Sequence, residues 1–224
     1  MIIQKLQLTT NNMEAQLQFY VGTLGFKLTT RNTTSFTFEA GETLVEFNFV
    51  NEKIVPVHFA FSVKAKDILS ILEFLHERLT PINNNSNPVF SFPNWKAKSI
   101  YFYDSDKNII EFILRKCDTC NISKLFTINN VIRVCEIGVV CANCQQAACL
   151  IQKNLKLTRF IGENKHFIPM GNSEGLLILV EYGQKKWFPT DQYAEFNRIE
   201  TEILIQGKLE HLICENGLIL FRNN

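Results

Sequence analysis

The chain has 224 residues, which allows one large domain or two domains of about 110 residues each. A formal net charge of +1 provides no electrostatic attraction to nucleic acid or to a membrane surface, so we predict neither partner. The opening residues MIIQKLQLTT are typical of a strand rather than a signal peptide, and no apolar run approaches the roughly 20 residues of a membrane span. Seven cysteines without an export signal predict free thiols in a cytoplasmic protein.

The first predicted element is a strand over 2–10, followed by a helix that begins after Asn12, a good N-cap residue. Apolar residues then recur at helical spacing, and Gly25 ends the helix as a C′ residue. Three strand-like runs come next, FKLTT, TSFTFEAG and ETLVEFNFV. The first 50 residues therefore predict a β-α-β-β-β unit.

The same order of elements begins again at PVHFAFSV. An amphipathic helix follows, with its apolar face formed by Ile68, Ile71, Leu72, Leu75 and Leu79. The runs NPVFSF, KSIYFYD and NIIEFILRK predict three more strands. The polar segment KCDTCNISK breaks this pattern, so we predict a linker over 117–126 between a first domain, 1–116, and a degenerate second domain, 127–224.

The second half repeats the pattern less completely. VIRVCEIGVV predicts a strand, Asn143 caps the next helix, and a third β-α-β-β-β unit ends at GLLILVEYG. The last stretch, IETEILIQGKLEHLICENGLILF, is too short for a full unit, so we expect strands with a missing or vestigial helix. The whole chain is interpreted as an internal repeat, an α+β fold of tandem βαβββ modules.

Strand alternation places a few chargeable groups opposite the helices. In the strand at 57–63 the odd-numbered residues are apolar and pack beneath the helices, which turns His58 the other way. By the same parity Lys5, Glu46 and Glu111 also face away from the helices. If that side curls into one cleft, two carboxylates and an imidazole converge there, a set that suits a divalent metal such as Zn, Mn, Fe, Ni or Co. Burial of these groups without a positive partner would be costly.

Three phrases of the sequence resemble the vicinal oxygen chelate superfamily, also called the glyoxalase/bleomycin-resistance/dioxygenase superfamily. They are FYVGTLGFKL, HFAFSV and YFYDSDKNIIEF, the last with Ser105 and Lys107 where the family phrase has Pro and Gly. The resemblance covers nearly the whole chain and is strongest over 1–115. It implies modules paired into cup-shaped mixed sheets, with the first two modules forming one cup around a small-molecule ligand.

The resemblance also implies a metal set of Glu46, His58 and Glu111, in which Glu46 or Glu111 is catalytic as a ligand or proton shuttle. Each module of the glyoxalase members supplies one ligand from its first strand and one from its last. Lys5 stands where the family usually has His or Gln. It could pair with a carboxylate in place of the metal, become neutral and ligate, or leave three ligands and water, so the implied cofactor is one divalent metal or none.

Other residues on the same faces are predicted to contact the ligand, namely Lys5, Gln7, Asn48, Tyr101 and Tyr103. In the second half Glu136 falls at a first-strand ligand position, and Glu181 lies one residue from a last-strand position. No histidine accompanies them, so we interpret this half as structural, or as a wall of the cleft. A homodimer is compatible with the sequence, which does not decide the matter.

The cysteines carry a separate hypothesis. Cys117/Cys120 and Cys141/Cys144 form two Cys-x-x-Cys pairs at the edge of zinc-ribbon spacing. The second pair, however, straddles a predicted strand end and helix cap, and the region is rich in cysteine throughout. We therefore favour free thiols over a structural zinc.

The leading functional hypothesis is an enzyme of the glyoxalase (lyase) or dioxygenase type. By resemblance, a metal would bind the vicinal oxygens of a small substrate and stabilise an enediolate or similar anion. The rival is a non-catalytic binder, as in the antibiotic-sequestering members, which would hold an aromatic or cationic small molecule without metal. Lys5 favours the binder, whereas the Glu-His-Glu set favours the enzyme. A third hypothesis is an interaction scaffold.

Overall fold

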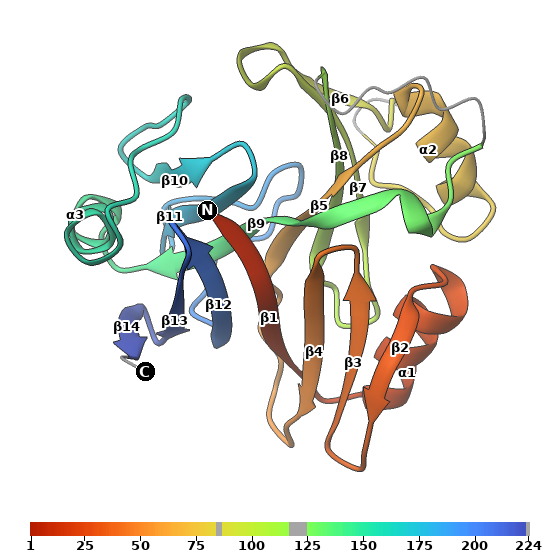
Figure 1. The fold of residues 1–224 in the computed structure, drawn as a ribbon, viewed down its shortest axis with the longest axis horizontal. Helices are drawn as coiled ribbons and strands as arrows, with labels where there is room; N and C mark the ends of the chain where they lie inside the picture. The colour runs from red at the N-terminus through yellow and green to blue at the C-terminus, as the bar shows by residue number, and fades with distance from the viewer. Residues whose placement is uncertain (84–86, 117–124, 223–224) are drawn as a thin grey trace.

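A computed structural model describes residues 1–83, 87–116 and 125–222 of the chain (Figure 1). The first module consists of β1 (Ile2–Thr10), α1 (Met13–Leu17), its π-helical continuation η1 (Gln18–Thr23), β2 (Lys27–Arg31), β3 (Ser35–Ala40) and β4 (Thr43–Phe49). The second consists of β5 (His58–Val63), α2 (Ile68–His76), β6 (Phe90–Phe92), η2 (Pro93–Trp95), β7 (Ala97–Tyr103) and β8 (Ile109–Arg115).

The second half begins with the short 3-10 helix η4 (Ile128–Asn130). It continues through β9 (Val131–Cys141), α3 (Cys144–Leu155), β10 (Phe167–Asn172) and β11 (Gly175–Glu181). The last stretch forms β12 (Ile199–Ile205), β13 (Lys208–Glu215) and β14 (Leu218–Arg222), with no helix among its described residues, as predicted. The third module is shorter than predicted, because the segment after α3 contributes only the isolated bridge between Arg159 and Met170 instead of a strand.

The capping residues in the sequence correctly predicted where α1 and α3 begin. The Asn12 side chain accepts a hydrogen bond from the Ala15 backbone N–H, and Asn143 accepts one from Gln146. Each bond satisfies a backbone donor that the first helical turn would otherwise leave without a partner. The tandem α+β architecture predicted from these signals is confirmed.

Two seven-stranded sheets carry the fold: one joins the first module to the last strands of the chain, and the other joins the second module to the third (Figure 1). Sheet A has the order β14-β13-β12-β1-β4-β3-β2, and sheet B has the order β10-β11-β9-β5-β8-β7-β6. The first strands of modules pair antiparallel, β1 with β12 and β5 with β9. The prediction that the first two modules form one cup is therefore wrong, because each finds its partner strand beyond 117–126. The proposed division into domains 1–116 and 127–224 does not coincide with the division into sheets.

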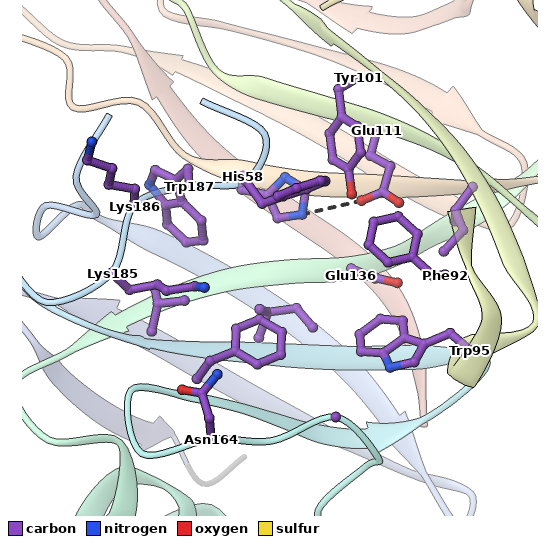
Figure 2. A pocket seen from close by; sticks show the side chains of 16 residues that line it. His58, Phe92, Trp95, Tyr101, Glu111, Glu136, Asn164, Lys185, Lys186 and Trp187 are labelled. Carbon is purple, nitrogen blue, oxygen red and sulfur yellow. Dashed lines mark ion pairs between the residues drawn. The ribbon is translucent and has the colours of Figure 1, made fainter. Parts of the chain in front are cut away.

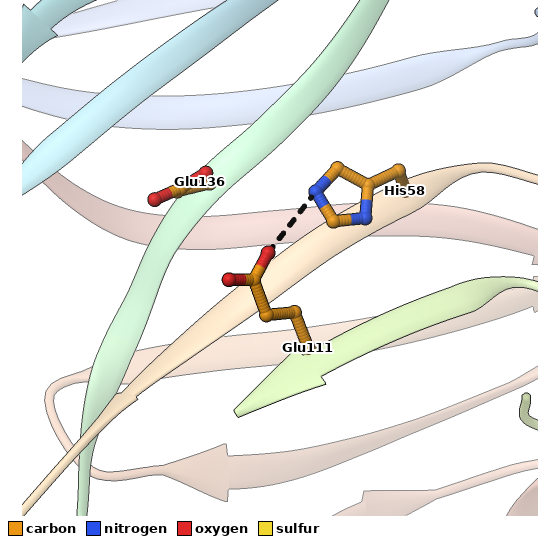
Figure 3. Close-up of side chains that lie close together, drawn as sticks. All are labelled: His58, Glu111 and Glu136. Atoms are coloured by element: carbon orange, nitrogen blue, oxygen red, sulfur yellow. Dashed lines mark ion pairs between the residues drawn. The ribbon is translucent and has the colours of Figure 1, made fainter. Parts of the chain in front are cut away.

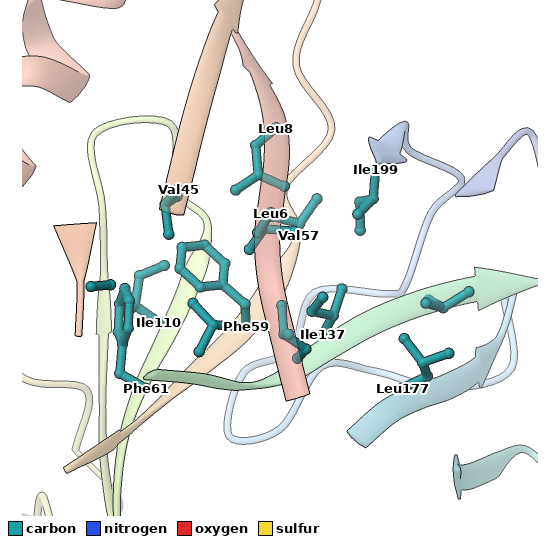
Figure 4. Close-up of a cluster of buried hydrophobic side chains, with 14 of the residues drawn as sticks. Leu6, Leu8, Val45, Val57, Phe59, Phe61, Ile110, Ile137, Leu177 and Ile199 are labelled. Carbon is teal, nitrogen blue, oxygen red and sulfur yellow. The ribbon is translucent and has the colours of Figure 1, made fainter. Parts of the chain in front are cut away.

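The apolar faces of the two sheets contribute to one buried core. Figure 4 shows side chains of this core from both sheets, among them Leu6, Leu8, Val45, Phe59, Phe61 and Ile137. The helices add apolar residues to the same cluster, including Tyr20 from η1, whose ring stacks on Phe38 at 4.7 Å between centroids. Because alternate residues point inward, the polar residues between them occupy the opposite faces. Within the described part of the chain, no helix is long and apolar enough to cross a membrane.

A buried carboxylate connects the first module to the second. The Tyr20 hydroxyl and the Gln16 amide donate hydrogen bonds to Asp104, at 2.8 and 2.9 Å, from the helix to the turn between β7 and β8. Burial raises the pKa of Asp104 to about 6, against the opposing effect of bonds from Asn108, Tyr20 and Gln16. Asn108 also accepts a bond from the Val57 backbone N–H at 2.8 Å. The turn therefore fixes the residue that immediately precedes β5.

Candidate metal centre

His58 is the first residue of β5, and its side chain lies on the outer face of sheet B (Figure 3). Its Nδ1 lies 2.9 Å from the carbonyl oxygen of Ile109. A carbonyl oxygen only accepts, so Nδ1 carries the proton and Nε2 presents a lone pair. Burial lowers the pKa of His58, although the charge of Glu111 opposes this, and the ring is neutral. Nε2 lies 3.6 Å from Oε2 of Glu111, beyond the range of a hydrogen bond.

Glu136 of β9 completes a cluster with His58 and Glu111 (Figure 3). One potential ligand atom from each residue lies within 4.8 Å of the other two. The residues are only 7%, 3% and 3% exposed for His58, Glu111 and Glu136. Among the described residues this is the one group of three His, Cys, Asp or Glu side chains close enough to share a metal ion.

The strand register explains why these three side chains meet. Ala60 of β5 pairs with Glu111 of β8 on one side and with Glu136 of β9 on the other. Ala60 lies two residues after His58, so His58 points to the same face. Neighbouring strands are about 4.8 Å apart, which brings two carboxylates and an imidazole from three adjacent strands into reach of one another.

Positive charge in the cluster comes from Arg115 at the end of β8. Its guanidinium lies 2.7 Å from Oε1 of Glu136, and both side chains are buried. Burial raises the pKa of Glu136, with a further contribution from the charge of Glu111, while Arg115 acts in the opposite direction and favours the ionised carboxylate. Glu111 forms no ion pair with a lysine or arginine in the described ranges, and its contact within the cluster is the neutral ring of His58. One carboxylate is therefore left without a cation.

Tyr101 holds Glu111 from the neighbouring strand. The two residues are directly opposite each other in the β7–β8 register, and their side chains are hydrogen-bonded. Burial raises the pKa of Tyr101 well above its ordinary value, and the charges of Glu111 and Glu136 raise it further. The hydroxyl therefore keeps its proton and donates to the carboxylate.

This donor set fits a divalent metal ion. One imidazole and two carboxylates suit iron, manganese, zinc, nickel or cobalt. The bond from Nδ1 of His58 to a backbone carbonyl is the outer contact that metal-binding histidines usually make, since it fixes the ring and leaves Nε2 free. The lone pair of Nε2 faces a carboxylate with no proton between them, which is repulsive unless a cation lies there.

A cavity of about 310 Å³ adjoins the cluster (Figure 2). Its walls are largely aromatic, formed by Phe92, Trp95, Tyr101, Phe167, Trp187 and Phe188. The loop between β11 and β12 supplies Trp187 and Phe188. Gly138 of β9 makes room for the indole, because a Cβ atom at this position would lie 2.5 Å from Cη2 of Trp187. The polar cluster is thus enclosed by flat apolar surfaces on several sides.

The structure brings together only some of the residues predicted to share a cleft. His58, Glu111 and Tyr101 line the cavity, whereas Tyr103 is half-buried at the end of β7 and is not among the lining residues. The prediction of one shared cleft is wrong for the residues of β1 and β4, because these strands belong to the other sheet. These residues are Lys5, Gln7, Glu46 and Asn48.

Glu46 instead has its own partners in sheet A. Lys5 Nζ lies 2.8 Å from its Oε2, and the Gln7 amide donates to its Oε1 at 3.2 Å. Burial alone would raise the pKa of Glu46, but the bond and charge of Lys5, with bonds from Asn48 and Gln7, lower it below its ordinary value. Of the three alternatives that the sequence left for Lys5, the structure therefore shows the first, in which Lys5 pairs with a carboxylate.

The second half contributes more than the sequence indicated. Glu136 occupies the first-strand ligand position, and its strand adjoins β5, which brings it into the cluster with His58 and Glu111. Of the two predicted roles for this half, structural or a wall of the cleft, the second describes Glu136, which lines the cavity. Glu181 lies elsewhere, with its Oε1 3.3 Å from Nδ1 of His166. The aromatic residues of the β11–β12 loop had no periodic pattern; the phrase KKWFP, 185–189, was the available signal.

The zinc hypothesis gains no support from the described cysteines. Cys117 and Cys120 lie outside the described residues. The sulfur atoms of Cys141 and Cys144 are 3.7 Å apart, and neither belongs to a metal-ligand group in the described part of the chain. Both are free and buried.

Comparisons with known proteins agree with this architecture. Residues 2–112 match the model of the Glyoxalase/Bleomycin resistance protein/Dioxygenase superfamily. A crystal structure from Bacillus subtilis, described as "putative dioxygenase", is similar over 100% of this chain and 70% of its own, with a TM-score of 0.58 and 14% identity. This similarity shows the fold of the whole chain.

Two further structures are similar over about half of the chain. One is a glyoxalase/bleomycin resistance protein/dioxygenase from Nocardioides, with 21% identity over 51% of this chain and 83% of its own and a TM-score of 0.43. The other is lactoylglutathione lyase from Agrobacterium tumefaciens, with 17% identity over 50% of this chain and 92% of its own and a TM-score of 0.41. No curated protein matches the chain.

Proposed function

Because residues 2–112 match the model of the Glyoxalase/Bleomycin resistance protein/Dioxygenase superfamily, we propose that this protein is a divalent-metal-dependent enzyme of the dioxygenase type. Its substrate is a small molecule with two vicinal oxygens. His58, Glu111 and Glu136 would hold the metal, in place of the set with Glu46 that the sequence predicted. The observation that carries the proposal is the buried, neutral His58, whose lone pair is directed at the carboxylate of Glu111 beside a cavity.

The number of donors favours a dioxygenase over a lyase with four protein ligands. His58 lies near Glu111 because Ala60, two residues after His58, pairs with Glu111. In the equivalent strands of the third module, Gly138 lies two residues after Glu136 and pairs with Ile178 of β11, so Ile178 occupies the position equivalent to Glu111. The fourth ligand position is therefore apolar, and Ile178 lines the cavity. Three protein donors with open positions are also the number found in non-haem iron oxygenases, although their triad has two histidines and one carboxylate and this one has the reverse. A bound metal would supply Lewis-acid activation of the vicinal oxygens.

The residues around the metal set have separate roles. Arg115 holds Glu136 in place and balances its charge, and the Tyr101 hydroxyl orients Glu111. The aromatic walls of the cavity offer flat surfaces to a planar substrate. We also propose a cytoplasmic location, because the described cysteines are all free thiols.

Metal analysis of the purified protein tests this function. After incubation with iron, manganese, zinc, nickel or cobalt and gel filtration, we expect about one ion per chain for at least one metal. His58→Ala should lose it. His76→Ala, a change at an exposed position at the end of α2, is the matched control and should retain it.

Oxygen uptake by the metal-loaded protein with a catechol then separates a dioxygenase from a lyase. A protein that takes up none of the five metals, and in which His58→Ala changes nothing, would be the metal-free binder instead. Metal binding without oxygen uptake would support the proposed metal centre but would contradict the dioxygenase reaction.

A further inference from the structure

Lys185 places a cation at the cavity opposite the metal set (Figure 2). It lies in the loop between β11 and β12, and its half-buried side chain lines the cavity. Its Nζ lies 5.7 Å from the centre of the Phe167 ring, which supports the apolar stem and attracts the charge. Among the described residues no carboxylate forms an ion pair with it. In Figure 2 its amine points into the cavity.

The next residue, Lys186, provides a comparison because it already forms an ion pair. Lys186 also borders the cavity, but its Nζ lies 2.7 Å from Oδ1 of Asp191. Its side chain is exposed and is directed away from the centre of the cavity in Figure 2. Its charge is therefore already balanced by a neighbouring carboxylate, whereas that of Lys185 is available to a ligand.

A second donor borders the same cavity. The Oδ1 atom of Asn164 accepts a hydrogen bond from the His166 backbone N–H at 3.0 Å, which orients the amide and leaves its NH₂ group free to donate. Asn164 and Lys185 both line the cavity and both offer donors, which is the requirement of a small anion.

We propose that Lys185, assisted by Asn164, is a specificity-determining residue that binds a carboxylate of the substrate. The substrate would be a planar aromatic acid, with its vicinal oxygens toward His58 and its carboxylate toward Lys185. One cation and one amide match the single negative charge of a carboxylate. The placing of the vicinal oxygens rests on the proposed function, but the anion subsite itself does not.

Paired ligands that differ only in charge test the subsite. Quenching of tryptophan fluorescence gives Kd for 3,4-dihydroxybenzoate and for its neutral amide, since Trp95 and Trp187 line the cavity. We expect the wild-type protein to prefer the acid by about tenfold, the strength of one charge-assisted hydrogen bond. Lys185→Met, which retains most of the stem, should reduce this preference to less than about twofold. Lys186→Met is the matched control and should keep it.

Three results would overturn the subsite. They are no preference for the acid in the wild-type protein, a preference that survives in Lys185→Met, and an equal loss in Lys186→Met. Thermal unfolding of each variant shows that the fold is intact before the titrations are compared.

A second pair of ligands separates this proposal from the proposed function. Benzoate and benzamide have no vicinal oxygens, and His58→Ala lacks the central metal ligand. If the subsite is correct, His58→Ala still prefers benzoate, and adding Lys185→Met removes that preference, whatever the metal analysis shows. If only the metal function is correct, the wild-type protein binds metal but does not distinguish acid from amide in either pair.

Discussion

The outer faces of the two sheets carry the same arrangement of groups, but only one is short of positive charge. In sheet A, Gln7 pairs with Glu46 on one side and with Glu200 on the other, and it lies two residues after Lys5. Sheet B has the same register around Ala60. Lys5, Glu46 and Glu200 are therefore the structural equivalents of the three residues of the metal centre, with lysine in place of the histidine.

The difference lies in how the carboxylates are balanced. In sheet A each has a cation: Lys5 lies 2.8 Å from Glu46, and Arg198 lies 2.5 Å from Glu200, although it also pairs with Glu215 at 2.7 Å. In sheet B only one of the two has such a partner. The sheet A groups are also more exposed: the Glu46 side chain is 17% accessible, against 3% for Glu111. One framework thus presents a self-neutralised polar surface on one sheet and a buried site that attracts a cation on the other.

His58→Lys should convert the centre of sheet B into a copy of sheet A, and it has the largest expected effect. The new ammonium group would pair with Glu111, as Lys5 pairs with Glu46, so metal binding should fall from about one ion per chain to none. The protein should remain folded, because the charge is balanced. Metal analysis with circular dichroism checks both points, and retention of the metal would show that the comparison is misleading.

Removing the arginine from each sheet should show how burial changes the contribution of an ion pair to the free energy of unfolding. In metal-free protein, Arg115→Met leaves Glu136 buried without a cation and should lower the free energy of unfolding by about 3–5 kcal/mol. Arg198→Met is the matched change in sheet A, where the pair is exposed, and should cost less than about 1 kcal/mol. Urea unfolding measures both, and equal costs would contradict the contrast between the two faces.

The junction of the first two modules should respond to pH through Asp104. Its pKa is about 6 in the folded protein against 3.8 as the ordinary value, so the folded state binds the proton more tightly. The resulting stabilisation is fully present below about pH 4 and is lost as the pH rises through about 6, by about 3 kcal/mol at 1.36 kcal/mol per pKa unit.

Asp104→Asn cannot ionise and should lose this part of the pH dependence. The measurement is urea unfolding of both proteins between pH 4 and 7, and the difference between the two curves isolates Asp104 from other titrating groups. Parallel curves would mean that burial does not raise the pKa of Asp104 in the folded protein.

Lys5→His is the reverse exchange and should have the smallest effect. It restores the histidine position in sheet A, but Glu200 remains paired with Arg198, and the site has no enclosing aromatic walls among the described cavity residues. We expect no bound metal and a change in the free energy of unfolding of less than about 1 kcal/mol. Stoichiometric metal in this variant would show that the histidine alone decides the outcome.

Sequence alternation was sufficient to predict which side of each strand faces away from the core. It placed His58 and Glu111 correctly, because the period of two is a local property of the strand. It could not identify the partner strands, since β5 presents the same alternating pattern whether it pairs with β1 or with β9. Glu136 was noted at a ligand position but excluded for want of a neighbouring histidine, and the histidine comes from another module. Trp187 and Lys185 lie in an irregular loop, where no periodicity exists to be read.

The pairing of β1 with β12 has a consequence for how the protein is made. The Thr201 hydroxyl donates to the carbonyl oxygen of Lys5 at 2.7 Å, across 196 residues of chain. During translation β1 must therefore wait with one edge open until Thr201 of β12, 196 residues after Lys5, has left the ribosome. Unpaired strand edges are sticky toward other chains, and such distant contacts form slowly. Nascent chains that stall before β12 should be the form most in need of chaperones.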